Sequence, residues 1–178
     1  MSKKFFSSDW HLYHQNIIKY VSRPFKTTRD MNESIIQRHN NVVGKEDEFW
    51  MLGDLCVASP EYVGKISKIV NKMNGRKHIV LGNHDDWKAR SYIKAGFMSA
   101  HTASWFEYGG FNFYMMHDPA EYAIIESDPK AILLCGHIHN LFRDLLPDKR
   151  VINVGLDVWD YRPISLEQIL TLISDANG

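Results

Sequence analysis

Short apolar runs alternate with helical patterns along the chain. Five runs have the length and composition of buried β-strands, and they cover residues 3–8, 48–52, 78–81, 111–116 and 132–135. Apolar residues also recur at helical spacing in four segments, which begin near Asp30, Pro60, Asp86 and Leu166. Because strands and helices alternate in sequence, the pattern predicts an α/β layered fold.

Helix starts and turns carry their own signals. Three helix starts have capping patterns: Asp30 with Glu33, Ser59 with Pro60, and Ser165 with Gln168. Hairpins are predicted at Gly109-Gly110 and, between strands at 141–146 and 150–154, at Pro147-Asp148. No repeat, low-complexity tract or linker divides the chain, so residues 1–178 are predicted to form a single domain.

Composition and charge narrow the function only a little. Hydrophobic residues make up 44% of the chain and charged residues 24%, as in an ordinary soluble protein. Lys+Arg and Asp+Glu both number 21, so no net basic field indicates a nucleic-acid or membrane-surface partner. Cys56 and Cys135 suggest small core residues in a reducing compartment. Without a signal-peptide pattern or a membrane-spanning run, a cytoplasmic location is expected.

Polar residues follow each predicted strand at its end. The five clusters are Asp9-Trp10-His11, Gly53-Asp54, Gly82-Asn83-His84-Asp85, His117-Asp118 and Gly136-His137-Ile138-His139. In an open α/β sheet, ligands bind beyond the carboxyl ends of the strands, so the five clusters are predicted to converge. Each cluster taken alone has an ordinary structural interpretation, such as a turn or a satisfied buried polar group. Their shared position at strand ends favours one functional site.

This ordered set of motifs resembles that of the calcineurin-like metallophosphoesterase superfamily, which reads D-x-H, G-D, G-N-H-(D/E), H and G-H-x-H. The resemblance spans positions 9 to 139, and no element is missing. It implies two packed mixed β-sheets flanked by helices. It also implies two metal sites: Asp9, His11 and His139 for the first ion, Asn83, His117 and His137 for the second, and Asp54 bridging both.

The residue types suit this chemistry. Mixed nitrogen and oxygen ligands favour two divalent transition-metal ions, of which Mn²⁺ is the first choice and Fe, Zn, Ni or Co are possible. Water bound to two such ions loses a proton near neutral pH, which would supply a hydroxide nucleophile for attack on phosphorus. The same ions would stabilise the charge that develops during in-line displacement.

A separate role is expected for His84. The family uses the histidine after the metal-binding asparagine to contact phosphate and to protonate the leaving oxygen, and histidine titrates in the range that this task requires. Two interpretations of Asp85 remain open, because it could orient the His84 imidazole or cap the helix predicted from residue 86.

Two further features have a functional and a structural interpretation. The segment 13–29 could cover the site, with Arg23 as the best candidate for a substrate contact, but a solvated connection is favoured. Trp10, Trp159 and Tyr161 could stack on a nucleobase if they line the cleft, although packing is favoured.

The expected activity is hydrolysis of a phosphodiester, with phosphomonoesters as a second possibility and a small phosphate ester or nucleotide as substrate. After Gly53-Asp54 the chain continues Leu55-Cys56-Val57, and it lacks the arginine of the protein-phosphatase pattern G-D-x-V-D-R-G. Segments 8–18 and 155–163 resemble a compact bacterial and phage branch of the family. One alternative is a nuclease, which would need a basic groove that the flat net charge does not support. The other is a non-catalytic scaffold, which would have lost ligands that this chain retains.

Overall fold

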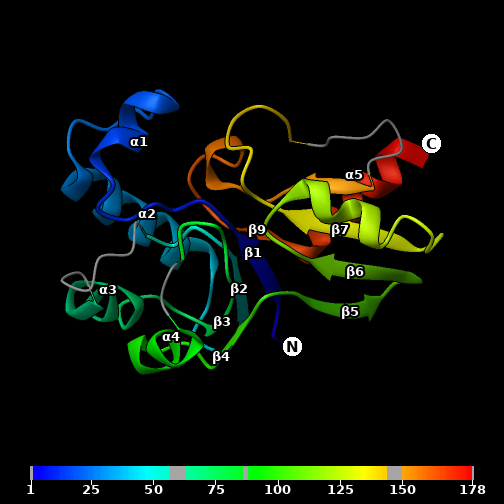
Figure 1. The fold of residues 1–178 in the computed structure, drawn as a ribbon, viewed down its shortest axis with the longest axis horizontal. Helices are drawn as coiled ribbons and strands as arrows, with labels where there is room; N and C mark the ends of the chain where they lie inside the picture. The colour runs from blue at the N-terminus through cyan, green and yellow to red at the C-terminus, as the bar shows by residue number, and fades with distance from the viewer. Residues whose placement is uncertain (1, 57–62, 86–87, 144–149, 178) are drawn as a thin grey trace.

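Nine strands form two β-sheets in the part of the chain that the computed structural model describes, residues 2–56, 63–85, 88–143 and 150–177 (Figure 1). The first sheet has the order β4-β3-β2-β1-β9. Its strands are β1 (Lys4–Ser7), β2 (Glu48–Leu52), β3 (Arg76–Val80), β4 (Ser99–His101) and β9 (Ile164–Ser165). Strands β1 to β4 run parallel, and β9 is antiparallel to β1.

The second sheet has the order β5-β6-β7-β8. Its strands are β5 (Ser104–Tyr108), β6 (Phe111–Met115), β7 (Ala131–Cys135) and β8 (Val151–Asn153). Strands β5 and β6 form an antiparallel hairpin, whereas β7 and β8 continue the sheet in parallel. The expectation of two mixed sheets is therefore confirmed.

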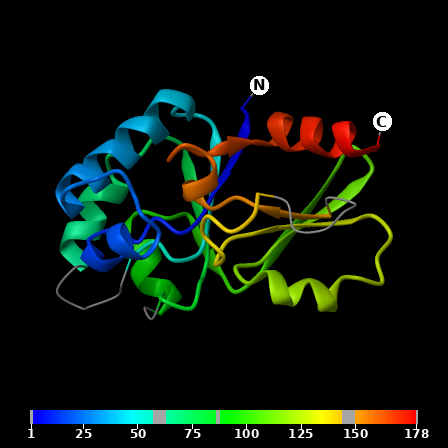
Figure 2. The ribbon, with the colours of Figure 1, turned by 90° about the horizontal axis from the view of Figure 1, so that it is seen from above.

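The outer face of the first sheet is covered by the helices α1 (Gln15–Tyr20), α2 (Thr28–Val42), α3 (Val63–Val70) and α4 (Ala89–Ala95). Helix α5 (Leu166–Asn177) runs along the second sheet (Figure 2), and its apolar residues belong to the core between the two sheets. Short 3₁₀ helices lie at Pro119–Ile124 (η2) and Leu156–Val158 (η3). Among the described residues, no helix combines the length and the apolar character that a bilayer crossing requires.

The central strands are apolar on both faces, because each sheet is covered on both sides. Along β2, Phe49 and Met51 pack towards the helices, whereas Trp50 and Leu52 pack into the layer between the two sheets. Residues of β6, β7 and α5 complete that inner layer. Because both faces of these strands are packed, the position of each strand end is well defined, and so is the start of the loop that follows it.

Several local predictions are confirmed. The hairpin at Gly109-Gly110 joins β5 to β6, and Tyr108 pairs with Phe111 across it. Ser165 and Gln168 form the expected capping box at the start of α5, through reciprocal hydrogen bonds of 3.0 and 3.2 Å. Both cysteines are buried, as expected for core residues.

Other local predictions are wrong. Helix α2 begins at Thr28, and its N-cap Thr27 accepts the 3.1 Å hydrogen bond from the backbone nitrogen of Asp30. Glu33 instead pairs with Arg29 one turn earlier on the exposed face. The segment 13–29 is more than a solvated connection, because it contains α1 with Ile17 and Ile18 buried against the helical layer.

The described residues do not form the predicted second hairpin. Strand β8 pairs in parallel with β7, because its apolar residues Val151 and Ile152 extend the cores on the two faces of the second sheet. Residues 141–143 form no strand, and 144–149 lie outside the described residues. The Ser59-Pro60 helix start also lies outside the described residues, as do the first two residues of the helix predicted at 86–95.

Candidate metal centre

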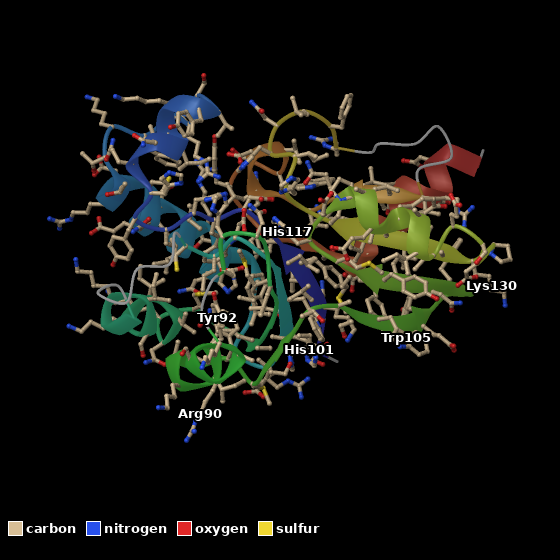
Figure 3. All side chains as sticks on the ribbon, viewed as in Figure 1. Arg90, Tyr92, His101, Trp105, His117 and Lys130 are labelled. Carbon is tan, nitrogen blue, oxygen red and sulfur yellow. The ribbon has the colours of Figure 1, made fainter. Side chains whose placement is uncertain are left out.

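The motif loops converge at the carboxyl ends of β1, β2, β3, β6 and β7. Backbone hydrogen bonds join the first two loops, from the nitrogen of Asp9 to the carbonyl of Gly53 at 3.0 Å and from His11 to Asp54 at 2.9 Å. A third bond of 2.9 Å ties Gly136 to the carbonyl of His117. His117 lies at the junction of the two sheets in Figure 3. The site is therefore assembled across both sheets.

The backbone of these loops is bent into an unusual conformation. Five of the seven predicted ligands have positive φ angles: Asp9 at 59°, His11 at 48°, Asp54 at 56°, His137 at 72° and His139 at 50°. Side-chain-bearing residues rarely adopt this left-handed region, and such strain concentrates at functional sites. Here it turns consecutive ligands of one loop towards a common centre.

The seven predicted ligands lie together in two overlapping groups. The ligand atoms of Asp9, His11 and His139 lie within 4.8 Å of one another, and so do those of Asp9, Asp54 and His117. Asn83 completes the second group, because its Oδ1 lies 3.0 Å from both His117 Nε2 and His137 Nδ1.

Asp54 faces an imidazole of each group, whereas Asp9 is the member that the two groups share. The Oδ2 atom of Asp54 lies 3.4 Å from the Nε2 atom of His11 and 3.4 Å from that of His117. Its other oxygen accepts a 2.9 Å hydrogen bond from the backbone nitrogen of His84. A carboxylate oxygen equidistant from imidazoles of both groups has the position that a bridging ligand requires.

The donor set fits divalent metal ions. The Nε2 atom of His11 is buried and has no hydrogen-bond partner among the described residues, although it faces the Asp54 carboxylate. Burying an imidazole nitrogen without a hydrogen-bond partner costs free energy, and coordination of a metal ion would remove that cost. The nitrogen and oxygen donors suit Mn, Fe, Co, Ni or Zn.

Burial and charge set the protonation of the centre. Burial lowers the pKa of His11 to about 3, which keeps its imidazole neutral. Burial also acts against ionisation of Asp54 and His117, but their hydrogen bond and opposite charges outweigh it. The pKa of Asp54 therefore falls to about 2, and that of His117 rises to about 9. A metal ion would replace the proton that this pair holds.

Polar contacts behind the ligands orient them. The Nδ1 atom of His117 lies 2.8 Å from the carbonyl of Leu52, so its Nε2 faces the centre. Ser8 donates to Asp9 at 2.6 Å, and the Nδ1 atom of His139 lies 3.0 Å from a carboxylate oxygen of Asp157. The sequence motifs did not identify Asp157 as a site residue. It does lie in segment 155–163, which resembles a branch of the family, and that resemblance could have drawn attention to it.

Both interpretations of Asp85 are wrong. Its buried carboxylate accepts four hydrogen bonds, from the backbone nitrogens of Asp54, Leu55 and Gly82 and from the hydroxyl of Tyr92. It contacts neither the His84 ring nor the start of α4, whose N-cap is Lys88. Asp85 instead joins two of the ligand loops.

Arg23, the candidate for a substrate contact, does not have that role. Its side chain is fully buried and forms an ion pair with Asp157. The packing interpretation of the aromatic residues is correct. Trp10 is buried and donates to Ser7, Trp159 donates to the carbonyl of Asn153, and Tyr161 packs edge-on against Phe25.

Comparisons with known proteins agree with the family resemblance and with the fold. Residues 5–165 match the calcineurin-like phosphoesterase superfamily domain. An uncharacterised protein of Methanocaldococcus jannaschii, MJ1445, is 32% identical over 97% of this chain and 92% of its own length. The crystal structure of AQ665, a protein of unknown function from Aquifex aeolicus, is similar with a TM-score of 0.77 and 28% identity, over 97% of this chain and all of that one. An archaeal phosphodiesterase shares the fold at 18% identity and a TM-score of 0.51, over 92% and 99% of the two chains.

Proposed function

We propose that this chain, which belongs to the calcineurin-like phosphoesterase superfamily, hydrolyses phosphodiesters at a dinuclear metal site. Membership of the family makes it a metal-dependent phosphoesterase. The observation that carries the finer proposal is the placement of the Asp54 Oδ2 atom 3.4 Å from both His11 and His117. That atom faces one imidazole of each proposed site, which supports Asp54 as the ligand that both ions would share.

The proposed ligands divide around Asp54. Asp9, His11 and His139 would hold the first ion, and Asn83, His117 and His137 would hold the second. Manganese is the metal that we propose to test first, because the nitrogen and oxygen donors accept it and neither buried cysteine is part of the site, and the same donors suit Fe, Co, Ni or Zn. When bound, two divalent ions polarise phosphoryl oxygens and lower the pKa of a coordinated water.

The chain itself supplies the acid. His84 is exposed at the mouth of the site, and its ring centroid lies 5.4 Å from that of His11. Its backbone is fixed by the hydrogen bond to Asp54, so the loop that carries the imidazole keeps a constant position relative to the proposed bridge. From there His84 would bind a phosphate oxygen and protonate the departing oxygen.

The charge around the site favours diesters. A phosphodiester carries one negative charge, whereas a phosphomonoester carries up to two at neutral pH and gains more from an arginine in the site. Arg23 hydrogen bonds the backbone of the proposed ligand Asp9, but its side chain is buried in its pair with Asp157 and cannot reach a substrate. The archaeal phosphodiesterase gives this assignment only a shared fold.

The test compares two model substrates on Mn²⁺-loaded protein. We expect bis-p-nitrophenyl phosphate to be hydrolysed with a higher kcat/KM than p-nitrophenyl phosphate, and EDTA to abolish both reactions. A preference for the monoester would overturn the diester assignment. Hydrolysis that survives complete removal of metal would overturn the mechanism.

A further inference from the structure

Arg23 is the centre of a buried polar network behind the proposed first metal site. Its guanidinium carries five N–H donors, and five contacts match them. Nε donates a 2.8 Å hydrogen bond to Asp157. The two N–H groups of Nη2 donate one hydrogen bond of 2.9 Å to Asp157 and one of 2.6 Å to the carbonyl of Asp9. Nη1 contacts the carbonyl of Trp10 at 2.9 Å and the sulfur of Met31 at 3.4 Å. No donor is left for another ligand.

The network connects two proposed ligands of the same ion. One end is the Asp9 backbone, which Arg23 holds directly. The other end is His139, whose Nδ1 lies 3.0 Å from the Asp157 oxygen that Arg23 Nη2 also contacts. These ligands are 130 positions apart in sequence (139 − 9), so their relative placement depends on tertiary contacts such as this one.

At the proposed second site, the histidine ligand has a weaker hydrogen-bond partner behind it. There the Nδ1 atom of His117 meets a neutral backbone carbonyl, that of Leu52. A carboxylate partner makes an imidazole a more basic ligand than a carbonyl partner does. Either partner fixes the tautomer, because Nδ1 keeps the proton and Nε2 is left free for a metal ion, so the difference lies in the basicity of the ligand. The two sites therefore differ in how the chain prepares a histidine for binding.

We infer that Arg23 and Asp157 are positioning residues that set the tautomer and the placement of His139 and so strengthen metal binding at the first site. This inference rests on the proposed function, because it takes Asp9, His11 and His139 as ligands of one ion. Asp157 acts on His139 directly. Arg23 acts through Asp157 and through the Asp9 backbone.

A purely structural role predicts a different outcome. The buried pair also joins the segment after α1 to η3, so losing it would lower stability in either case. A structural role would leave the His139 tautomer and the relative strength of the two metal sites unchanged. These two properties therefore decide between the roles.

The first experiment titrates metal-free protein with Mn²⁺ by calorimetry. We expect the unaltered protein to bind two ions, and Asp157→Asn to weaken one of them by about 10- to 100-fold while the other changes little. The matched control is Asp160→Asn, three residues away, where the carboxylate is 60% exposed and pairs with surface arginines. It should bind both ions like the unaltered protein.

The second experiment reads the tautomer without metal. Imidazole ¹⁵N spectra of the unaltered protein should show the His139 proton on Nδ1, and Asp157→Leu should move it towards Nε2. Arg23→Lys keeps the charge and loses the planar fork, so it should weaken the same Mn²⁺ site if Asp157→Asn does not fold.

The outcomes separate the two proposals. Absence of Mn²⁺ binding by the unaltered protein would overturn the proposed function and this inference together. Two tight ions in the unaltered protein and equally tight binding in Asp157→Asn would overturn only this inference. An unchanged His139 tautomer in Asp157→Leu would also overturn it.

Discussion

The buried carboxylate of Asp85 accepts a 2.7 Å hydrogen bond from the backbone nitrogen of Asp54. The same oxygen accepts another, of 2.9 Å, from Gly82 at the start of the loop that carries Asn83 and His84. Asp85 therefore fixes the proposed bridging ligand relative to the proposed acid. Burial raises its pKa to about 6, which still leaves the group ionised at neutral pH.

Replacing Asp85 tests this connection. In Asp85→Asn one carboxylate oxygen becomes an NH₂ group, which faces backbone N–H donors and cannot accept their hydrogen bonds. We expect the free energy of unfolding to fall by about 1–3 kcal/mol and turnover to fall with it. Tyr92→Phe, which removes the hydroxyl that donates to Asp85 and keeps the backbone donors, should cost less. Urea denaturation of both variants measures the difference, and an Asp85→Asn protein as stable as the unaltered one would contradict this account.

Replacing His84 separates catalysis from metal binding. His84→Ala leaves the backbone hydrogen bond to Asp54 in place, so both metal ions should still bind. We expect turnover of a diester to fall by about 10²- to 10⁴-fold, the usual contribution of a general acid. Calorimetric Mn²⁺ titration beside rate measurements gives both values. Loss of metal in parallel with activity would mean that His84 is a ligand. The control is His101→Ala on β4, which should leave both metal binding and turnover unchanged.

The motif glycines test the close approach of the loops. A Cβ added at Gly136 would overlap the Ser8 hydroxyl and the Asp9 carboxylate. Gly136→Ala should therefore displace Asp9, weaken Mn²⁺ binding and destabilise the fold. Gly64→Ala in α3 meets nothing within 4 Å and should stabilise the helix by about 0.5–1 kcal/mol. Thermal unfolding with and without Mn²⁺ checks both, and tight metal binding by Gly136→Ala would contradict the loop geometry.

The buried histidine His39 should make the stability of the fold depend on pH. Its ring is buried between Trp10 and Phe49, its Nε2 lies 3.0 Å from the carbonyl of Asn74, and burial lowers its pKa to about 4. The unfolded chain has the ordinary pKa of about 6.5, so it binds a proton that the folded state does not bind as the pH falls from 6.5 to 4. Stability is therefore present above pH 6.5 and is lost across that window.

The His39→Gln variant isolates this contribution, because glutamine can donate to the same carbonyl and does not titrate. Between pH 7 and pH 5, the unaltered protein should lose about 2 kcal/mol more unfolding free energy than the variant. Urea denaturation of both proteins in EDTA measures this. Equal losses would show that His39 takes up its proton in the folded state.

The sequence predicted which residues lie together at the candidate site better than it predicted the details of the fold. The residues of the site directly follow apolar strands. Because these strands are buried on both faces, as Trp50 and Met51 show, they appear in the sequence as continuous apolar runs that can be recognised. The pairing of β8 was not predictable in this way. A strand of three residues is too short to show a periodic pattern. Its partner β7 runs parallel to it, so the two strands are not joined by a tight turn that the sequence would reveal.

The roles of Arg23 and Asp85 were missed for a related reason. Both are charged residues next to motifs, and a charge in that position indicates a functional contact as readily as a buried structural one. Only the tertiary structure shows that Arg23 meets Asp157, 134 positions later, and that Asp85 accepts hydrogen bonds from a loop 30 and 31 positions earlier. Long-range pairing of this kind leaves no periodic signal in the sequence.

The most direct test of the central claim is the rate of bis-p-nitrophenyl phosphate hydrolysis as Mn²⁺ is added to metal-free protein. If two ions share Asp54, the rate should lag behind the first equivalent, rise steeply towards the second and reach its plateau at two ions per chain. A plateau at one ion per chain, or a full rate with no metal bound, would contradict the dinuclear site.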